Sequence, residues 1–117
     1  MPFNDKNNLP AGYAKGDTSA RSLALEVLKE VEEREAYLNL VLNRTLSSIS
    51  LSDAERSLFT ELAYGVMQRR NTLDWALSLY LNRPVEKLTI WIRNILRMGV
   101  YQLLYLPRIP DSAAVDE

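Results

Sequence analysis

Several basic side chains in the second half of the chain have the type and spacing to bind phosphate groups. Arg93 and Arg97 lie four residues apart in an apolar stretch, so an α-helix would place them on one face. With the adjacent pair Arg69 and Arg70, they predict a phosphate-binding surface of the kind that contacts nucleic acid. The full set of candidate residues is Arg69, Arg70, Lys87, Arg93, Arg97 and Arg108.

A structural role is the alternative for the same side chains. Arg97 would then pair with a carboxylate from another helix. Arg69 and Arg70 stand at the end of a helical pattern and would complement the negative end of that helix. The charge pattern alone leaves both roles open.

The composition excludes most catalytic centres. The chain contains no cysteine and no histidine, which removes thiolate metal sites, cysteine nucleophiles and the commonest general base. The four glycines never cluster, so the sequence has no glycine-rich phosphate loop. Glu30, Glu32, Glu33 and Glu35 are predicted to form a solvated helix face. We therefore expect no catalytic residue, no metal site and no cofactor in these 117 residues.

The near-neutral total charge hides two regions of opposite sign. The formal net charge of the chain is −1. Residues 18–35 carry three basic and five acidic side chains, whereas residues 67–108 carry seven basic and two acidic ones. The second region, at +5, is where we expect contact with a polyanion.

Helices must position these residues, because apolar side chains recur at helical spacing and no period-2 run is bounded by turn signals. Ser52 and Glu55 form a capping-box pattern that opens one of the helices. The stretch 89–106 is apolar nearly all round, which is typical of a helix surrounded by others. The expected fold is an all-α bundle of five to six helices, at about 19–34, 37–46, 52–67, 71–81 and 89–106, with a sixth opening at Asp111.

Two glycines and five aromatic residues have expected structural roles. Gly65 and Gly99 lie inside helical patterns, where glycine costs roughly 0.8–1 kcal/mol relative to alanine. Close approach of another helix is the expected reason, and a backbone surface for a ligand is the alternative. The large aromatic residues are predicted to lie in the core rather than to stack on bases, because their spacing matches the apolar stripes. They are Tyr64, Trp75, Trp91, Tyr101 and Tyr105.

The chain start and the apolar stretch bear on location. Residues 1–17 are rich in Asn, Gly, Pro and Lys and are predicted to be a flexible tail. They lack the basic start and apolar run of a signal peptide. Residues 90–106 include two arginines, an asparagine and a glutamine, which a membrane span would not tolerate cheaply. We expect a soluble, cytoplasmic protein without membrane contact.

Several sequence patches, in this order, resemble one known domain. They are "ARSLALEVLKEVE" (20–32), "ELAYGVMQRRNTLDWAL" (61–77), "LNRPVEKL" (81–88) and "ILRMGVYQLLYLPRIPDSAAVDE" (95–117). Together they resemble the NusB-like domain and, more narrowly, the amino-terminal domain of the bacterial 16S rRNA cytosine-5 methyltransferase B family. The resemblance covers about residues 19–117 and implies an all-α fold of two small helical bundles.

The resemblance also implies a function. Residues 18–117 would be an incomplete RNA-binding domain that positions 16S rRNA and performs no chemistry. S-adenosylmethionine and two catalytic cysteines would belong to a catalytic domain that is absent here. NusB itself usually begins with an arginine-rich first helix, whereas here Arg21, Lys29 and Arg34 stand amid five acidic residues. We therefore expect RNA contact at Arg69, Arg70, Arg93 and Arg97.

Two other functions remain open. One is a protein-docking helical module, which would hold the catalytic domain or a ribosomal protein through apolar surface. The other is a stand-alone NusB-type transcription antitermination factor. Loss of the helices that would complete the domain should uncover apolar surface on the last helix, so we also expect dimerisation in concentrated solution.

Overall fold

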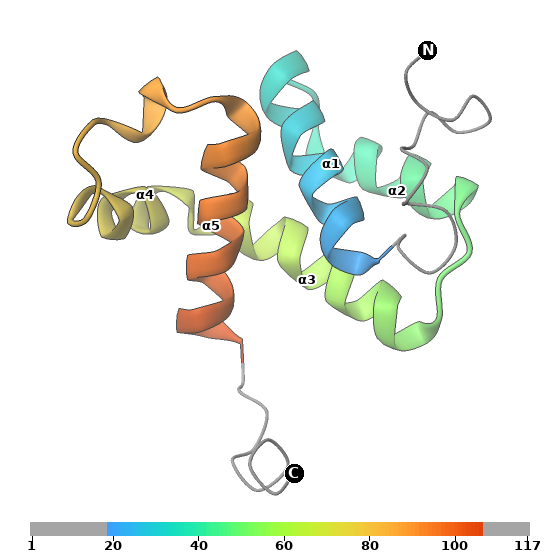
Figure 1. Ribbon diagram of the computed structural model, residues 1–117. Helices are drawn as coiled ribbons and strands as arrows, with labels where there is room; N and C mark the ends of the chain where they lie inside the picture. Colours follow the sequence, from blue (N-terminus) through green and yellow to red (C-terminus); the bar gives the residue numbers. More distant parts are fainter. Residues whose placement is uncertain (1–18, 107–117) are drawn as a thin grey trace, which may run out of the picture. The chain divides into compact units, whose positions relative to one another are not determined.

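The computed structural model describes residues 19–106, and within them every regular element is helical (Figure 1). This confirms the all-α prediction. The expected tail at 1–17 and the helix opening at Asp111 lie outside the described residues. The elements are α1 (Ala20–Arg34), α2 (Leu38–Ser48), α3 (Asp53–Gln68), α4 (Arg70–Ser78), the 3-10 helix η3 (Val85–Lys87) and α5 (Ile90–Tyr105).

Side-chain caps lie at the starts of α1, α3 and α5. The Ser52 hydroxyl accepts a hydrogen bond from the Glu55 amide at 3.1 Å, and the Glu55 carboxylate accepts from the Ser52 amide at 3.3 Å. The predicted capping box at the start of α3 is therefore confirmed. Ser19 and Thr89 cap α1 and α5 in the same manner, each through its side-chain oxygen.

The chain divides into two compact units, residues 1–63 and 64–117. In the first unit α1 packs against α2, as the blue and cyan helices of Figure 1 show. Phe59 and Leu62 of α3 are completely buried. The apolar stripe of α1 is buried and consists of Ala20, Leu23, Ala24, Val27, Leu28 and Val31.

The second unit contains the end of α3, then α4, η3 and α5. α4 packs against both η3 and α5. Its last turn is tighter than predicted, because the amides of Leu79 and Tyr80 donate to carbonyls three residues back, at 3.2 and 3.0 Å. The helix therefore ends at Ser78 rather than near Leu81, and the prediction did not include η3.

The expectation that α5 is enclosed by other helices is wrong within the described residues. One face of α5 buries Asn94, Arg97, Met98 and Tyr101. Its opposite face exposes large apolar side chains, because 100° per residue turns them away from the buried ones. They are Ile92, Ile95 and Leu103, with 47 to 79% of each residue exposed. No described helix combines the length and apolarity that a membrane span requires.

The two helical glycines have different surroundings. At Gly65 an added methyl group would collide with the ring of Tyr101, so the expected close approach of another helix is confirmed there. At Gly99 an added methyl group would meet nothing within 4 Å, so the same expectation is wrong for this residue.

Candidate nucleic-acid interface

Arg97 is held in a buried polar network between α4 and α5. Its Nε donates to Asp74 Oδ1 at 2.7 Å and its Nη2 to Asp74 Oδ2 at 2.9 Å, a two-pronged ion pair. Nη1 also donates to Asn94 Oδ1 at 3.3 Å, and the Asn94 amide donates to the carbonyl of Ile90. Only 5% of Arg97 is exposed, so it has the structural role that the sequence left open. It does not join the surface proposed below.

Arg93, one turn before Arg97, also has an internal contact. Its Nη1 donates to the carbonyl oxygen of Leu88 at 2.6 Å, and the residue is only partly exposed. This bond ties the side chain to the backbone just before α5. The four-residue spacing that suggested a shared phosphate-binding face thus serves internal contacts at both positions.

Arg69, at the junction of α3 and α4, stacks with two tyrosine rings. Its guanidinium carbon lies over the ring of Tyr105, 4.2 Å from the ring centroid. The Tyr105 ring stacks in turn on Tyr101, with centroids 5.3 Å apart and planes 27° from parallel. Tyr101 fits closely against Gly65, where a methyl group would collide with it. Close packing at Gly65 therefore underlies the position of the Arg69 side chain.

The remaining described cations of the second unit are exposed. Arg70 begins α4, Lys87 ends η3, and Arg83 lies in the loop between them. Within residues 19–106 none of these three side chains has a carboxylate partner. Arg83 was absent from the predicted set, although it contributes to the positive charge of that segment. Arg108 lies outside the described residues.

The two units differ in the sign of their charge. Described residues 19–63 carry five basic and eight acidic side chains, a net charge of −3. Described residues 64–106 carry six basic and two acidic ones, a net charge of +4. One of those two acids, Asp74, is already paired with Arg97. The second unit is therefore the part of the chain that suits a polyanion.

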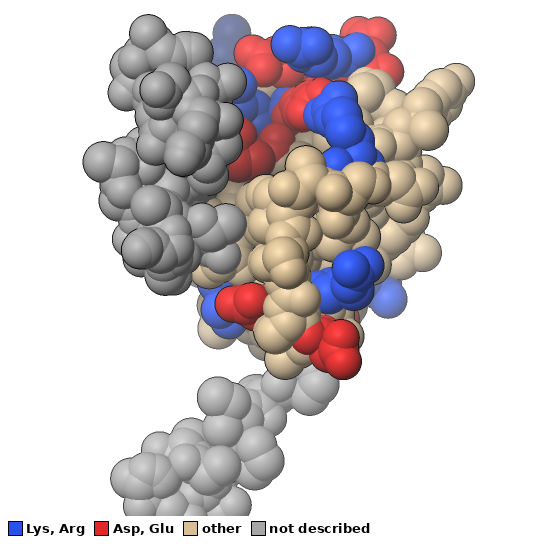
Figure 2. Space-filling view, turned by 90° about the vertical axis from the view of Figure 1, so that its right-hand side faces the viewer, with Lys and Arg blue, Asp and Glu red and all other residues tan. Residues whose placement is uncertain are grey.

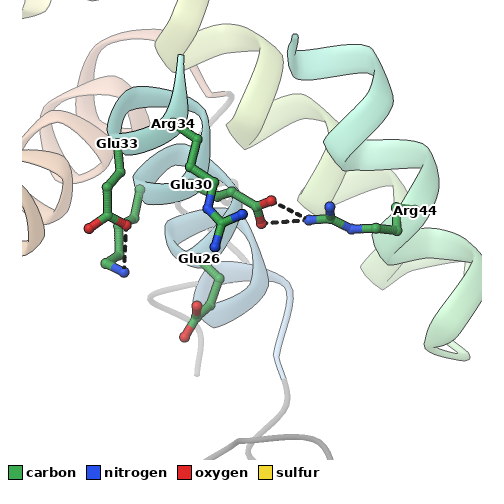
Figure 3. Close-up of a pocket in the computed structure, with 6 residues that line it drawn as sticks. Glu26, Glu30, Glu33, Arg34 and Arg44 are labelled. Atoms are coloured by element: carbon green, nitrogen blue, oxygen red, sulfur yellow. Dashed lines mark hydrogen bonds and ion pairs between the residues drawn. The ribbon is translucent and has the colours of Figure 1, made fainter. Parts of the chain in front are cut away.

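Basic residues of the first unit lie among acids. Arg44 of α2 donates from Nη2 to both carboxylate oxygens of Glu30 on α1, at 2.6 and 2.5 Å, and Lys29 pairs with Glu33 at 3.0 Å. These residues line an open polar pocket together with Arg34 (Figure 3). Glu30 and Glu33 are thus paired rather than simply solvated. On the face drawn in Figure 2, blue and red side chains likewise lie side by side, above and below an uncharged band.

Glu26 is the titratable group of this pocket whose pKa is shifted. Partial burial raises the pKa of the Glu26 carboxyl, Lys29 opposes this by lowering it, and the Glu30 carboxylate raises it further. The pocket is lined by carboxylates and by lysine and arginine side chains, and the described residues include no acidic cluster suited to a metal ion. Its ion pair between Glu30 and Arg44 joins α1 to α2.

Three of the aromatic residues assigned to the core are exposed, so the prediction is wrong for them. Trp75 is 64% exposed, Tyr64 40% and Trp91 37%, whereas Tyr101 is buried as predicted, at 5%. The exposure of Trp75 could have been predicted from its spacing along the helix. It lies two residues from both buried leucines of α4, Leu73 and Leu77, and residues two apart do not share a helix face.

Comparison with known proteins places this arrangement in a family. The model of the NusB family matches residues 18–117, which includes every described residue. The chain belongs to the NusB family. This membership agrees with the all-helical fold and confirms the resemblance seen in the sequence patches.

The proteins that resemble this NusB-family chain are much longer than the chain itself. It is 44% identical over 100 residues to the probable ribosomal RNA small subunit methyltransferase B of Bacillus subtilis. It is 40% identical over 98 residues to the protein of that name from Synechocystis, and 33% identical over 103 residues to ribosomal RNA small subunit methyltransferase B of Cronobacter sakazakii. These matches cover 84 to 88% of the chain but only the amino-terminal 22 to 23% of each relative.

Proposed function

We propose that this chain is a non-catalytic RNA-binding module of a 16S rRNA cytosine-5 methyltransferase and positions the rRNA substrate for the enzyme. The similarity to the amino-terminal part of ribosomal RNA methyltransferases supports this proposal. Chemistry, S-adenosylmethionine binding and the catalytic residues would belong to the remainder of such an enzyme. The absence of cysteine and histidine from the chain fits that division of labour.

The observation that carries the proposal is the placement of Arg69. Its guanidinium is held by the ring of Tyr105, without a carboxylate partner in the described part of the chain. A cation over an aromatic ring keeps its N–H donors available at the edge of the guanidinium plane. Those donors match the geometry of a phosphate group, and the stack fixes the side chain in advance.

The exposed cations Arg70, Arg83 and Lys87 would add phosphate contacts to the one made by Arg69. Each contact releases condensed counterions from the RNA, so affinity falls as salt rises. Four contacts to single-stranded RNA predict a slope of log affinity against log salt of about −3, at roughly −0.7 for each contact. Arg97 and Arg93 are left out of this count because their guanidinium groups already bind Asp74 and the Leu88 carbonyl.

Fluorescence anisotropy across a salt series tests the proposal, with a labelled fragment of small-subunit rRNA. The variant Arg69→Ala should weaken binding and reduce the magnitude of the slope by about 0.7. The control is Arg56→Ala, because Arg56 is an exposed cation of the acidic first unit. It removes the same charge and should leave the slope unchanged. A flat salt dependence in the unaltered chain would show that phosphates are not contacted.

The exposed face of α5 favours a second candidate function, the docking of another protein surface. Ile92, Ile95 and Leu103 lie on this face, with Gly99 among them and open space beside it. Exposed apolar patches promote association. Sedimentation velocity should detect a dimer at high protein concentration, and Ile95→Lys should shift the sample to monomer. A monomer at every concentration would contradict self-association through this face.

A further inference from the structure

Two large aromatic side chains of the second unit are mostly exposed. Trp75 of α4 is 64% exposed and Tyr80, two residues beyond the helix, is 86% exposed. Neither the Trp75 indole nitrogen nor the Tyr80 hydroxyl has a hydrogen-bond partner among residues 19–106. Both side chains therefore present a wide, polarisable ring to solvent.

The construction of α4 explains why these rings point outward. Leu73 and Leu77 are its buried residues, and Asp74 is committed to Arg97. Trp75 lies on the opposite face, with the exposed Leu79 four residues further on. Tyr80 lies two residues beyond Ser78, where α4 ends, and is exposed.

Exposed cations lie close to these rings along the chain. Arg70 precedes Trp75 by five residues, roughly 7.5 Å along a helix axis, and Arg83 follows Tyr80 by three. Neither cation has a carboxylate partner within the described residues. Aromatic rings interleaved with unpaired cations are the combination that binds single-stranded nucleic acid, since the cations follow the phosphates and the rings stack on bases.

We propose that Trp75 and Tyr80 form a stacking platform for unpaired bases, so that the chain prefers single-stranded RNA to duplex RNA. This inference rests on the proposed RNA-binding function and specifies its ligand class. Bases within a duplex are already stacked on one another, and a platform of this kind gains nothing from them. The cations would bind both forms, but the rings would bind only the unpaired one.

The experiment compares a labelled single-stranded oligoribonucleotide with a blunt duplex of the same length. Trp75→Ala should weaken binding of the single strand roughly 5- to 100-fold and leave duplex binding unchanged. Trp75→Phe should retain most of the affinity because it keeps a ring. The salt slope should be the same in all three proteins, because Trp75 carries no charge and releases no counterions.

Leu79→Ala is the matched control, because Leu79 is an exposed apolar residue on the same face of α4 but has no ring. Its single-strand affinity should equal that of the unaltered chain. An equal loss in Leu79→Ala and Trp75→Ala would point to general apolar docking and would overturn the platform. Circular dichroism should show unchanged helicity and melting, because neither side chain is buried.

A spectroscopic readout reports stacking independently of affinity. In a Trp91→Phe background Trp75 is the only tryptophan, and single-stranded RNA should quench its fluorescence. An oligonucleotide with abasic sites should bind without quenching. Salt-dependent RNA binding with no quenching and no effect of Trp75→Ala would overturn the platform while leaving phosphate binding intact. A chain that binds neither RNA would instead remove the proposed function, and the platform with it.

Discussion

The buried guanidinium of Arg97 needs hydrogen-bond and charge partners inside the protein. Arg97 is 5% exposed, and its charge is tolerated because both oxygens of Asp74 and the amide oxygen of Asn94 accept its hydrogen bonds. Removal of one partner from a buried pair leaves an uncompensated charge, which costs more than the pair itself contributes. The buried charge of Arg97 is therefore balanced by the carboxylate of Asp74 on α4.

We expect Asp74→Asn to destabilise the chain by about 3 kcal/mol, because the neutral amide cannot balance the buried charge of Arg97. Urea denaturation followed by circular dichroism measures the change. Glu30→Gln is the control, since it breaks an ion pair with the exposed Arg44 that should contribute less than about 1 kcal/mol. Equal effects of the two substitutions would show that burial does not distinguish the pairs.

The raised pKa of Glu26 predicts that the stability of the chain depends on pH. Because burial raises its pKa in the folded state above the ordinary value of 4.5, the native state binds its proton more tightly than the unfolded state does. Stability from this residue is therefore present at low pH and is lost as pH rises through the native pKa.

Replacement of this carboxyl by an amide should consequently raise the melting temperature at pH 7 and have almost no effect near pH 4. Thermal melts of Glu26→Gln between these limits measure the difference. Glu35→Gln is the matched control, because it makes the same substitution at an exposed residue just beyond the end of the same helix. A gain at pH 4 as large as that at pH 7 would mean that proton binding is not the cause.

At the scale of helices, the two interior glycines offer a matched pair. Gly99→Ala should stabilise the chain by roughly 0.5–1 kcal/mol, because alanine favours the helix and its methyl group meets nothing within 4 Å. Gly65→Ala should destabilise it by about 1–3 kcal/mol, because the methyl group collides with the Tyr101 ring. Chemical denaturation gives both values, and the same sign for both would contradict the packing described here.

The sequence predicted the helices well and their surroundings less well. Local patterns determine a capped start such as Ser52 or the buried stripe of α1, so these were predictable. The helix predicted at 71–81 extends beyond Ser78, where α4 ends, because the tight turn at Leu79 cannot be read from periodicity. The partner of Arg97 lies 23 residues away, and charge spacing along one helix does not identify such a contact.

For the molecule as a whole, the charge difference between the two units predicts behaviour that the total charge does not. The sequence isoelectric point of about 5.5 suggests that the chain should pass through a cation-exchange column at pH 7. The +4 unit should instead retain it, because a charged support responds to local rather than net charge. Arg69→Glu with Arg70→Glu should elute at lower salt, while Arg56→Glu should elute with the unaltered chain. Passage of the unaltered chain in the void volume would refute this.

The tight fit at Gly65 has a consequence for how the chain could be tuned. Tyr101 lies against this residue, Tyr105 lies on Tyr101, and Arg69 lies over Tyr105. A methyl group added at Gly65 of α3 would displace Tyr101, then Tyr105 and then Arg69. Arg69 is the cation that we assign to phosphate binding. A substitution inside the protein could then change the affinity for nucleic acid while leaving every surface charge in place.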